Sequence, residues 1–70
     1  MSGIQHKKPF GVYHWDTFDN NTILIAERCT HDAAIKFIKS TYKKRINLNG
    51  ADRVDIVDKA GNVVQSYKVC

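Results

Sequence analysis

Few residues of this 70-residue chain stand at spacings that support metal binding. Cys29 and His31 are near neighbours, as are His14 and Asp16, and all four are common ligand types. Zinc sites, however, typically pair their ligands at C-x2-4-C or H-x3-5-H spacing, and neither spacing occurs in the chain. We therefore expect no metal site, and no residue pattern predicts another cofactor.

Catalysis by a nucleophile or by paired carboxylates is also poorly supported. At a helix entrance, the spacing of Cys29 and His31 does not bring their side chains together. Asp52, Asp55 and Asp58 recur every three residues, but on a strand Asp55 faces away from the other two. The glycines form no phosphate-binding pattern, and so small a domain leaves little room for a deep pocket. We therefore do not expect an enzyme.

Positive charge is the stronger signal, and it lies in the second half of the chain. The formal net charge is +4, with 3 basic and 4 acidic side chains in residues 1–35 and 8 basic and 3 acidic in residues 36–70. A basic patch favours anionic partners, although a solvated helix face is the plainer interpretation. The candidates for contact with an anionic partner are Lys36, Lys39, Lys43, Lys44 and Arg45.

These basic residues belong to a predicted helix that spans residues 30–45. Thr30 is the expected N-cap, because its hydroxyl can accept from a free backbone N–H of the first turn. Lys36, Lys39 and Lys43 are expected to line one exposed ridge. Ile35 falls on the flank of the apolar side. The apolar stripe at helical spacing consists of Ala33, Ala34, Phe37, Ile38, Thr41 and Tyr42.

The helix is flanked by four predicted strands that pair as two hairpins: residues 9–16, 22–28, 52–58 and 62–69. The first hairpin turns at residues 17–21. The second turns at residues 58–62, where Gly61 is expected in the left-handed region of a bulge turn. The order ββαββ predicts an α+β fold, an antiparallel sheet of two hairpins with one amphipathic helix packed on one face. Residues 9–70 form a single domain, and residues 1–8 are expected to be a flexible N-terminal arm.

The first hairpin is expected to be apolar on both faces, although one helix covers only one of them. With strict alternation, Tyr13 and Trp15 face away from Phe10 and Val12, and Ile23 and Ile25 face away from Leu24 and Ala26. Because monomers rarely expose large apolar patches, a second subunit is expected to pair through the open face or through an open strand edge. The interface candidates are Tyr13, Trp15, Ile23 and Ile25. Tyr13 and Trp15 could instead stack bases, but the lysines of the helix are expected on the other side.

Location follows from the apolar runs and the cysteines. No apolar run approaches the roughly 18 residues of a membrane span, so no membrane association is expected. The two cysteines, Cys29 and Cys70, are too few for a disulfide framework. They are expected to be reduced thiols of a cytoplasmic protein, and whether Cys70 forms an intermolecular disulfide stays open.

These observations predict a small non-enzymatic binding protein that acts as a homodimer or small oligomer. Its partner is expected to be another protein or a small anionic ligand. Its size suits an accessory or inhibitor protein of a phage or bacterium, by analogy alone. The alternative is a nucleic-acid-binding protein that uses the basic helix face, for which binding would weaken steeply with salt.

Overall fold

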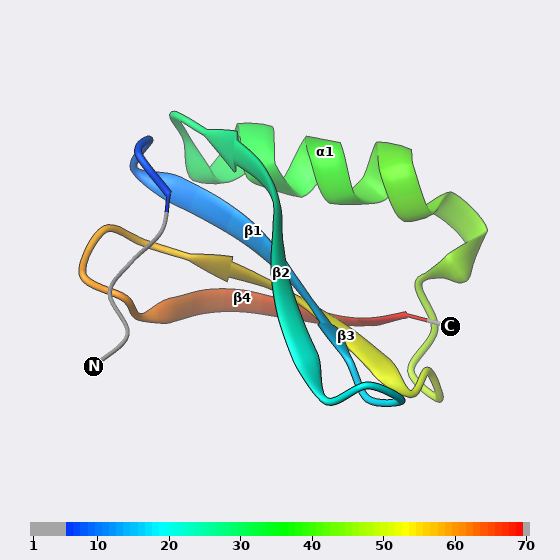
Figure 1. Ribbon diagram of the computed structural model, residues 1–70. Coiled ribbons are helices and arrows are strands. Elements are labelled where there is room, and N and C mark those ends of the chain that lie inside the picture. The colour runs from blue at the N-terminus through cyan, green and yellow to red at the C-terminus, as the bar shows by residue number, and fades with distance from the viewer. Residues whose placement is uncertain (1–5, 70) are drawn as a thin grey trace.

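The computed structural model describes residues 6–69, which form a four-stranded antiparallel sheet with one helix across one face (Figure 1). The elements are β1 (Phe10–Asp16), β2 (Asn21–Arg28), α1 (His31–Tyr42), the 3₁₀ turn η1 (Lys43–Arg45), β3 (Asp52–Val57) and β4 (Val63–Val69). The strand order is β2-β1-β3-β4, so β1 and β3 are central and β2 and β4 are edge strands. The predicted ββαββ order and α+β class are confirmed.

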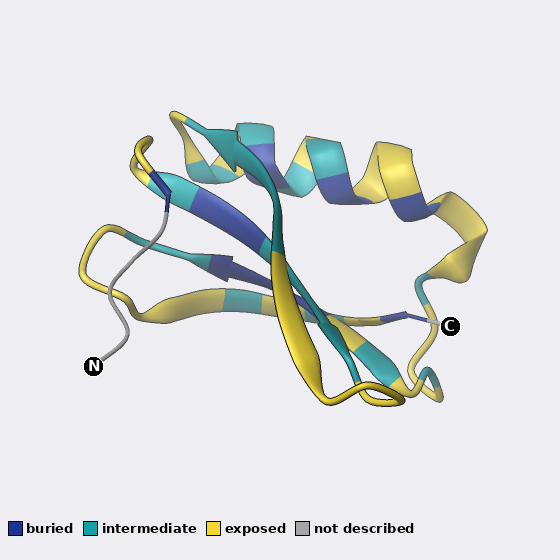
Figure 2. Cartoon of the chain, viewed as in Figure 1, coloured by how far each residue is buried: buried dark blue, intermediate teal, exposed yellow. Residues whose placement is uncertain are grey.

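The core lies between α1 and the central strands (Figure 2). Val12 of β1 and Val54 and Ile56 of β3 have no exposed surface, and neither have Ala34 and Ile38 of α1. These residues follow the two-residue period of a strand and the roughly four-residue recurrence of a helix face. The apolar pattern of the sequence therefore predicted most of the core.

Two positions of α1 differ from the predicted stripe. Thr41 is exposed, whereas Ile35 is half-buried and packs against the core. The packed face is centred on Ile38 and Tyr42, which are four residues apart and both buried. With about 100° between successive residues, a packed face centred on these two residues includes Ile35 and leaves Thr41 at its edge.

The start of α1 is determined by Thr30. Its hydroxyl oxygen accepts the Ala33 backbone N–H at 3.1 Å, and its carbonyl oxygen accepts the Ala34 N–H at 3.2 Å. Asp32 lies in the first turn, where the positive end of the helix dipole favours an anion. The predicted N-cap is confirmed.

The end of α1 differs from the prediction. The helix stops at Tyr42 because Lys43 takes a positive φ of 41°, and η1 follows. Beyond η1, the Asn47 backbone N–H donates to the Lys68 carbonyl oxygen at 2.8 Å, which draws the chain to the end of β4. The last turn of the predicted helix over residues 30–45 is therefore not α-helical.

A β-bulge in the first hairpin overturns the predicted alternation of β2. Val12 is paired with Ala26 and Tyr13 with Leu24, so Ile25 is an extra residue on β2. In such a bulge two residues of one strand oppose a single residue of the other, and both Ile25 and Ala26 pack against the core. The prediction that Ile25 faces away from the helix is therefore wrong, and Leu24 lies opposite Tyr13 on that side.

The turn of the second hairpin matches the prediction. Gly61 has a φ of 90°, a conformation that glycine adopts without a Cβ clash. The Gly61 N–H donates to the Asp58 carbonyl oxygen at 3.1 Å, and the Asp58 N–H donates to the Asn62 carbonyl oxygen at 2.9 Å. The Asp58 carboxylate also accepts the Ala60 and Asn62 backbone N–H groups, each at 2.9 Å. Glycine is thus in the left-handed position that the turn requires.

The described part of the expected N-terminal arm is attached to the sheet, while residues 1–5 lie outside the described residues. The backbone N–H groups of Lys8 and Lys7 donate to one carboxylate oxygen of Glu27 at 3.0 and 2.6 Å. These two hydrogen bonds, that of Lys8 first, hold the pKa of Glu27 below its usual range. His6 is buried, with 4% of its surface exposed.

Candidate functional site

The side of the sheet opposite α1, called the helix-free face below, is defined by the two central strands (Figure 1). Val12 of β1 and Val54 and Ile56 of β3 belong to the core under α1. Because side chains alternate along a strand, their neighbours point to the other side. The helix-free face of β1 and β3 therefore carries Tyr13, Trp15, Arg53 and Asp55.

One row of side chains crosses the helix-free face through all four strands. Trp15 is paired with Thr22 of β2 and with Arg53 of β3, and Arg53 is paired with Lys68 of β4. Directly opposed residues of antiparallel strands share a face. We call Thr22, Trp15, Arg53 and Lys68 the cross-strand row. In this row one aromatic ring lies beside two cations.

Arg53 is held in place by partners on the same face. Its guanidinium carbon lies 4.9 Å from the centroid of the Trp15 ring, within the range of a cation–π contact. Its Nε–H lies 3.1 and 3.2 Å from the two carboxylate oxygens of Asp55. Asp55 is 8% exposed and also accepts the Ser66 hydroxyl at 2.7 Å. These contacts orient the guanidinium over Trp15 without covering the row.

The part of the helix-free face near Gly11 is covered by His6. The His6 Nδ1 atom lies 3.0 Å from the Tyr13 hydroxyl. A Cβ atom on Gly11 would lie 2.5 Å from that same Nδ1 atom, so the absence of a side chain there makes room for the imidazole. Arg53 and Lys68 are exposed, and the open part of the face is therefore the cross-strand row.

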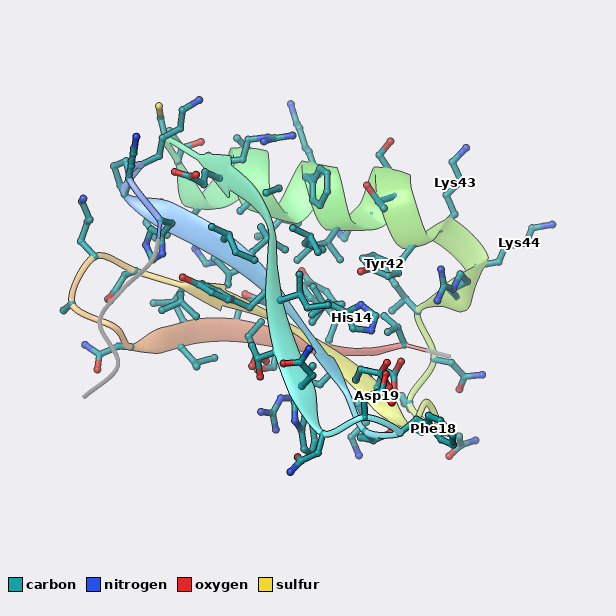
Figure 3. The ribbon with its side chains drawn as sticks, in the orientation of Figure 1. His14, Phe18, Asp19, Tyr42, Lys43 and Lys44 are labelled. Atoms are coloured by element: carbon teal, nitrogen blue, oxygen red, sulfur yellow. The ribbon has the colours of Figure 1, made fainter. Side chains whose placement is uncertain are left out.

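A second polar cluster lies on the other face, beneath the end of α1 (Figure 3). The Asp52 carboxylate lies 3.1 Å from His14 Nε2 and can only accept, so His14 donates through Nε2. His14 Nδ1 then accepts the Tyr42 hydroxyl at 2.7 Å. The Thr17 backbone N–H and hydroxyl donate to the other Asp52 oxygen at 3.2 and 3.0 Å. These bonds connect α1, β1, β3 and the first turn.

The order Tyr–His–Asp resembles a catalytic relay, but the surroundings of the cluster favour a structural role. Tyr42 is 5% exposed, and a general acid or base must reach its substrate directly or through one water. Burial raises the pKa of Tyr42. The hydrogen bond from His14, followed by the one from the Thr17 backbone, lowers the pKa of Asp52. We interpret the cluster as a connection between elements.

The lowered pKa of Asp52 gives an expected pH dependence of stability. Because the folded-state pKa lies below that of the unfolded chain, about 3.9, the ionised carboxylate stabilises the fold above about pH 4. This contribution is lost as the pH falls through the folded-state pKa. We expect thermal unfolding from pH 7 down to about pH 2 to show a smaller loss of Tm for Asp52→Asn than for the parent. Asp19→Asn, in the neighbouring exposed turn, is the control; an equal change in both variants would contradict the assignment.

The five basic candidates do not form one continuous ridge. Lys36 and Lys39 are exposed on α1, but Lys43 lies beyond the helix end at a positive φ. Lys43 and Lys44 extend outward from that end (Figure 3). The Arg45 guanidinium lies 5.3 Å from the centroid of the Tyr42 ring. The helix therefore aligns only the first two of the candidates.

The four interface candidates are also divided between the two faces. Tyr13 and Trp15 lie together on the helix-free face, where both are partly buried. Ile25 packs against the core. Ile23 is paired with His14 on the helix side of the edge strand and is 50% exposed.

Sequence reasoning placed Arg53 on the face opposite Val54 but did not bring it together with Lys68. It placed the positive charge on the helix, away from the aromatic residues. Alternation around Val54 was enough to put Arg53 on the open side. The position of Lys68 depends on the register between β3 and β4, which includes a shift between Ile56 and Val57 that no local pattern revealed.

The remaining candidates bring no further chemistry together. Across residues 6–69, no group of three or more His, Cys, Asp or Glu side chains is arranged to hold a metal ion. Cys29 is an exposed free thiol, and Cys70 lies outside the described residues. In the described part of the chain, no helix combines the length and apolar content needed to cross a membrane. No known protein family, curated protein or solved structure matches this chain.

Proposed function

We propose that this protein is a non-enzymatic binding protein that acts as a homodimer in the cytoplasm. In this proposal the subunits pair along β2, and the dimer binds another protein or a small anionic ligand. A role as an accessory or inhibitor protein of a phage or bacterium stays a prediction from size alone. An edge strand presents unpaired backbone groups that are a ready template for another strand.

The observation that carries this proposal is the composition of the β2 edge. Charged residues and prolines usually protect an edge strand from pairing with another chain. Neither stands between Thr22 and Ala26. Ile23 is half exposed on this strand. The charged residues Glu27 and Arg28 stand at the far end of the strand, and the bulge at Ile25 leaves residues 21–24 in regular pairing geometry.

The other edge strand, β4, is less available for pairing with a second subunit. At the end of β4 the Lys68 carbonyl oxygen already accepts the Asn47 N–H, and Ile46 forms a bridge with Val69. Val63 and Val64 are exposed at the start of β4, but the register shift after Ile56 falls there and interrupts regular pairing. We therefore assign the dimer contact to β2.

The pairing of two β2 strands has a defined geometry. Two antiparallel copies of one strand are related by a twofold axis perpendicular to the sheet, so the contact closes as an isologous dimer. The two sheets then form one continuous sheet with both helices on the same side. Both helix-free faces lie together on the opposite side.

The test is a matched pair of edge substitutions. We expect the parent protein to sediment as a dimer at micromolar concentration and Ile23→Lys to sediment as a folded monomer, because a charge on the pairing edge opposes association. Ile23 is 50% exposed, so the substitution spares the core. Val63→Lys, on the other edge at 55% exposure, should remain a dimer. A monomeric parent, or a dimer lost only in Val63→Lys, would overturn the assignment.

A further inference from the structure

We propose that the helix-free face binds single-stranded nucleic acid and that the cross-strand row of Thr22, Trp15, Arg53 and Lys68 is the contact site. The inference goes beyond the proposed function, which has another protein or a small anionic ligand as the partner. It does not need the dimer contact, because one subunit supplies the whole row.

The first reason is the cation–π pair of Trp15 and Arg53. Unpaired bases stack on aromatic rings and on the planar guanidinium of arginine. The guanidinium already lies over the Trp15 ring, and the Arg53 side chain is 47% exposed. The guanidinium therefore contacts the indole and belongs to a side chain with exposed surface that a base can reach. Tyr13 lies two residues along the same strand face, about 7 Å away along the strand, but its ring is in contact with His6, so the open stacking surface is at Trp15 and Arg53.

The second reason is the charge beside this stack. Arg53 uses its Nε–H for Asp55, and a guanidinium has further N–H donors that can reach a phosphate oxygen. Lys68 is directly opposite Arg53 and exposed. Asp55 offsets one positive charge, but it is only 8% exposed. The surface that a ligand meets therefore has cationic side chains next to an aromatic ring.

The third reason is the shape of the surface where the row reaches β4. A groove of about 400 Å³ lies there, lined by Ile46, Asn47, Leu48, Arg53, Ser66, Tyr67 and Lys68. Its volume is within the range of small-ligand sites, about 300–1,000 Å³. Leu48 is 88% exposed and offers an apolar contact to a base.

The same features favour a single strand over a duplex and the sheet over the helix. In a duplex the base faces are stacked on one another, so an aromatic platform cannot reach them. On the helix side, Lys36 and Lys39 are exposed, and the Arg28 guanidinium lies 4.8 Å from the centroid of the Phe37 ring. In that pair both residues are partly buried, whereas Arg53 is exposed on the sheet, and Tyr42 is buried. A helix-bound strand would therefore have phosphate contacts with less exposed surface for stacking.

Trp15 makes the test direct, because it is the only tryptophan of the chain. We expect a single-stranded oligonucleotide of about 12 nucleotides to quench tryptophan emission to saturation, and a duplex of the same length not to. Arg53→Gln with Lys68→Gln should weaken binding at least about tenfold and reduce the salt slope by about two, one for each lost phosphate contact. Lys36→Gln with Lys39→Gln removes equal charge from α1 and should leave affinity unchanged. Circular dichroism confirms that each double variant is folded.

Two substitutions of Trp15 test stacking apart from charge. With a labelled oligonucleotide, Trp15→Ala should lose roughly 5- to 150-fold in affinity, and Trp15→Phe should recover most of that loss because its ring keeps a stacking face. Unchanged emission at low salt, equal quenching by duplex, or equal losses in the helix and row variants would each overturn the inference. If the protein is a dimer but binds no oligonucleotide, the nucleic-acid inference is overturned and the dimer proposal stands. If the protein is a monomer that binds an oligonucleotide, the dimer proposal is overturned and the nucleic-acid inference stands.

Discussion

Ile38→Ala is expected to lower the free energy of unfolding by about 2–5 kcal/mol. Ile38 has no exposed surface and is among the largest fully buried side chains of the described residues. Alanine is a better helix former than isoleucine, so the loss comes from the cavity and not from the helix backbone. A domain of this size has a total stability of only about 4–10 kcal/mol, and the variant is therefore expected to be partly unfolded at 37 °C.

Urea unfolding followed by circular dichroism measures this change. Thr41→Ala on the same helix is the matched control, because the apolar pattern predicted Thr41 in the packed stripe and the structure leaves it exposed. Its effect should stay within about 0.5 kcal/mol. A cost at Thr41 equal to that at Ile38 would mean that α1 packs in the predicted orientation and not in the observed one.

Gly50→Ala is expected to destabilise the protein by about 1–3 kcal/mol, although its backbone is not in the left-handed region. A Cβ atom at this position would collide with the backbone carbonyl group of Val69, and backbone cannot move aside as a flexible side chain can. Where space allows, Gly→Ala stabilises by about 0.4–1 kcal/mol through the unfolded state. The sign of the change in unfolding free energy therefore shows whether the backbone at Gly50 lies close to the backbone of Val69.

Thermal and urea unfolding give that sign directly. Asn49→Ala, one residue away in the same turn and exposed, keeps the backbone N–H that donates to the Asn47 side chain and should change stability little. A stabilised Gly50→Ala variant would show that the loop does not lie against the end of β4.

The parts of the fold that sequence predicted are those determined by local chemistry. Val54 and Ile56 alternate with polar neighbours, Thr30 has the hydroxyl of an N-cap, and Gly61 follows a turn pattern that requires a positive φ. Each of these depends on a few consecutive residues. The order of elements and the buried face of the sheet followed from them.

The parts that sequence could not predict depend on contacts between distant segments. Arg53 and Lys68 meet only through the pairing of β3 with β4. The bonds of His14 to Tyr42 and Asp52 join residues 28 and 38 positions apart. The bulge at Ile25 arises from how β2 fits β1. For the same reason, the candidate site was predicted on the helix and its cationic half was found on the sheet.

The bulge at Ile25 also shifts the alternation of inward and outward side chains along β2 by one residue. Residues 21–24 are in one phase of inward and outward positions, and residues 26–28 are in the other. Loss of Ile25 would remove the bulge and leave one uninterrupted alternation, in which Ile23 and Ala26 still face α1 and Leu24 still faces away. The extra residue therefore adds an apolar side chain to the core without changing which other residues of β2 face the helix.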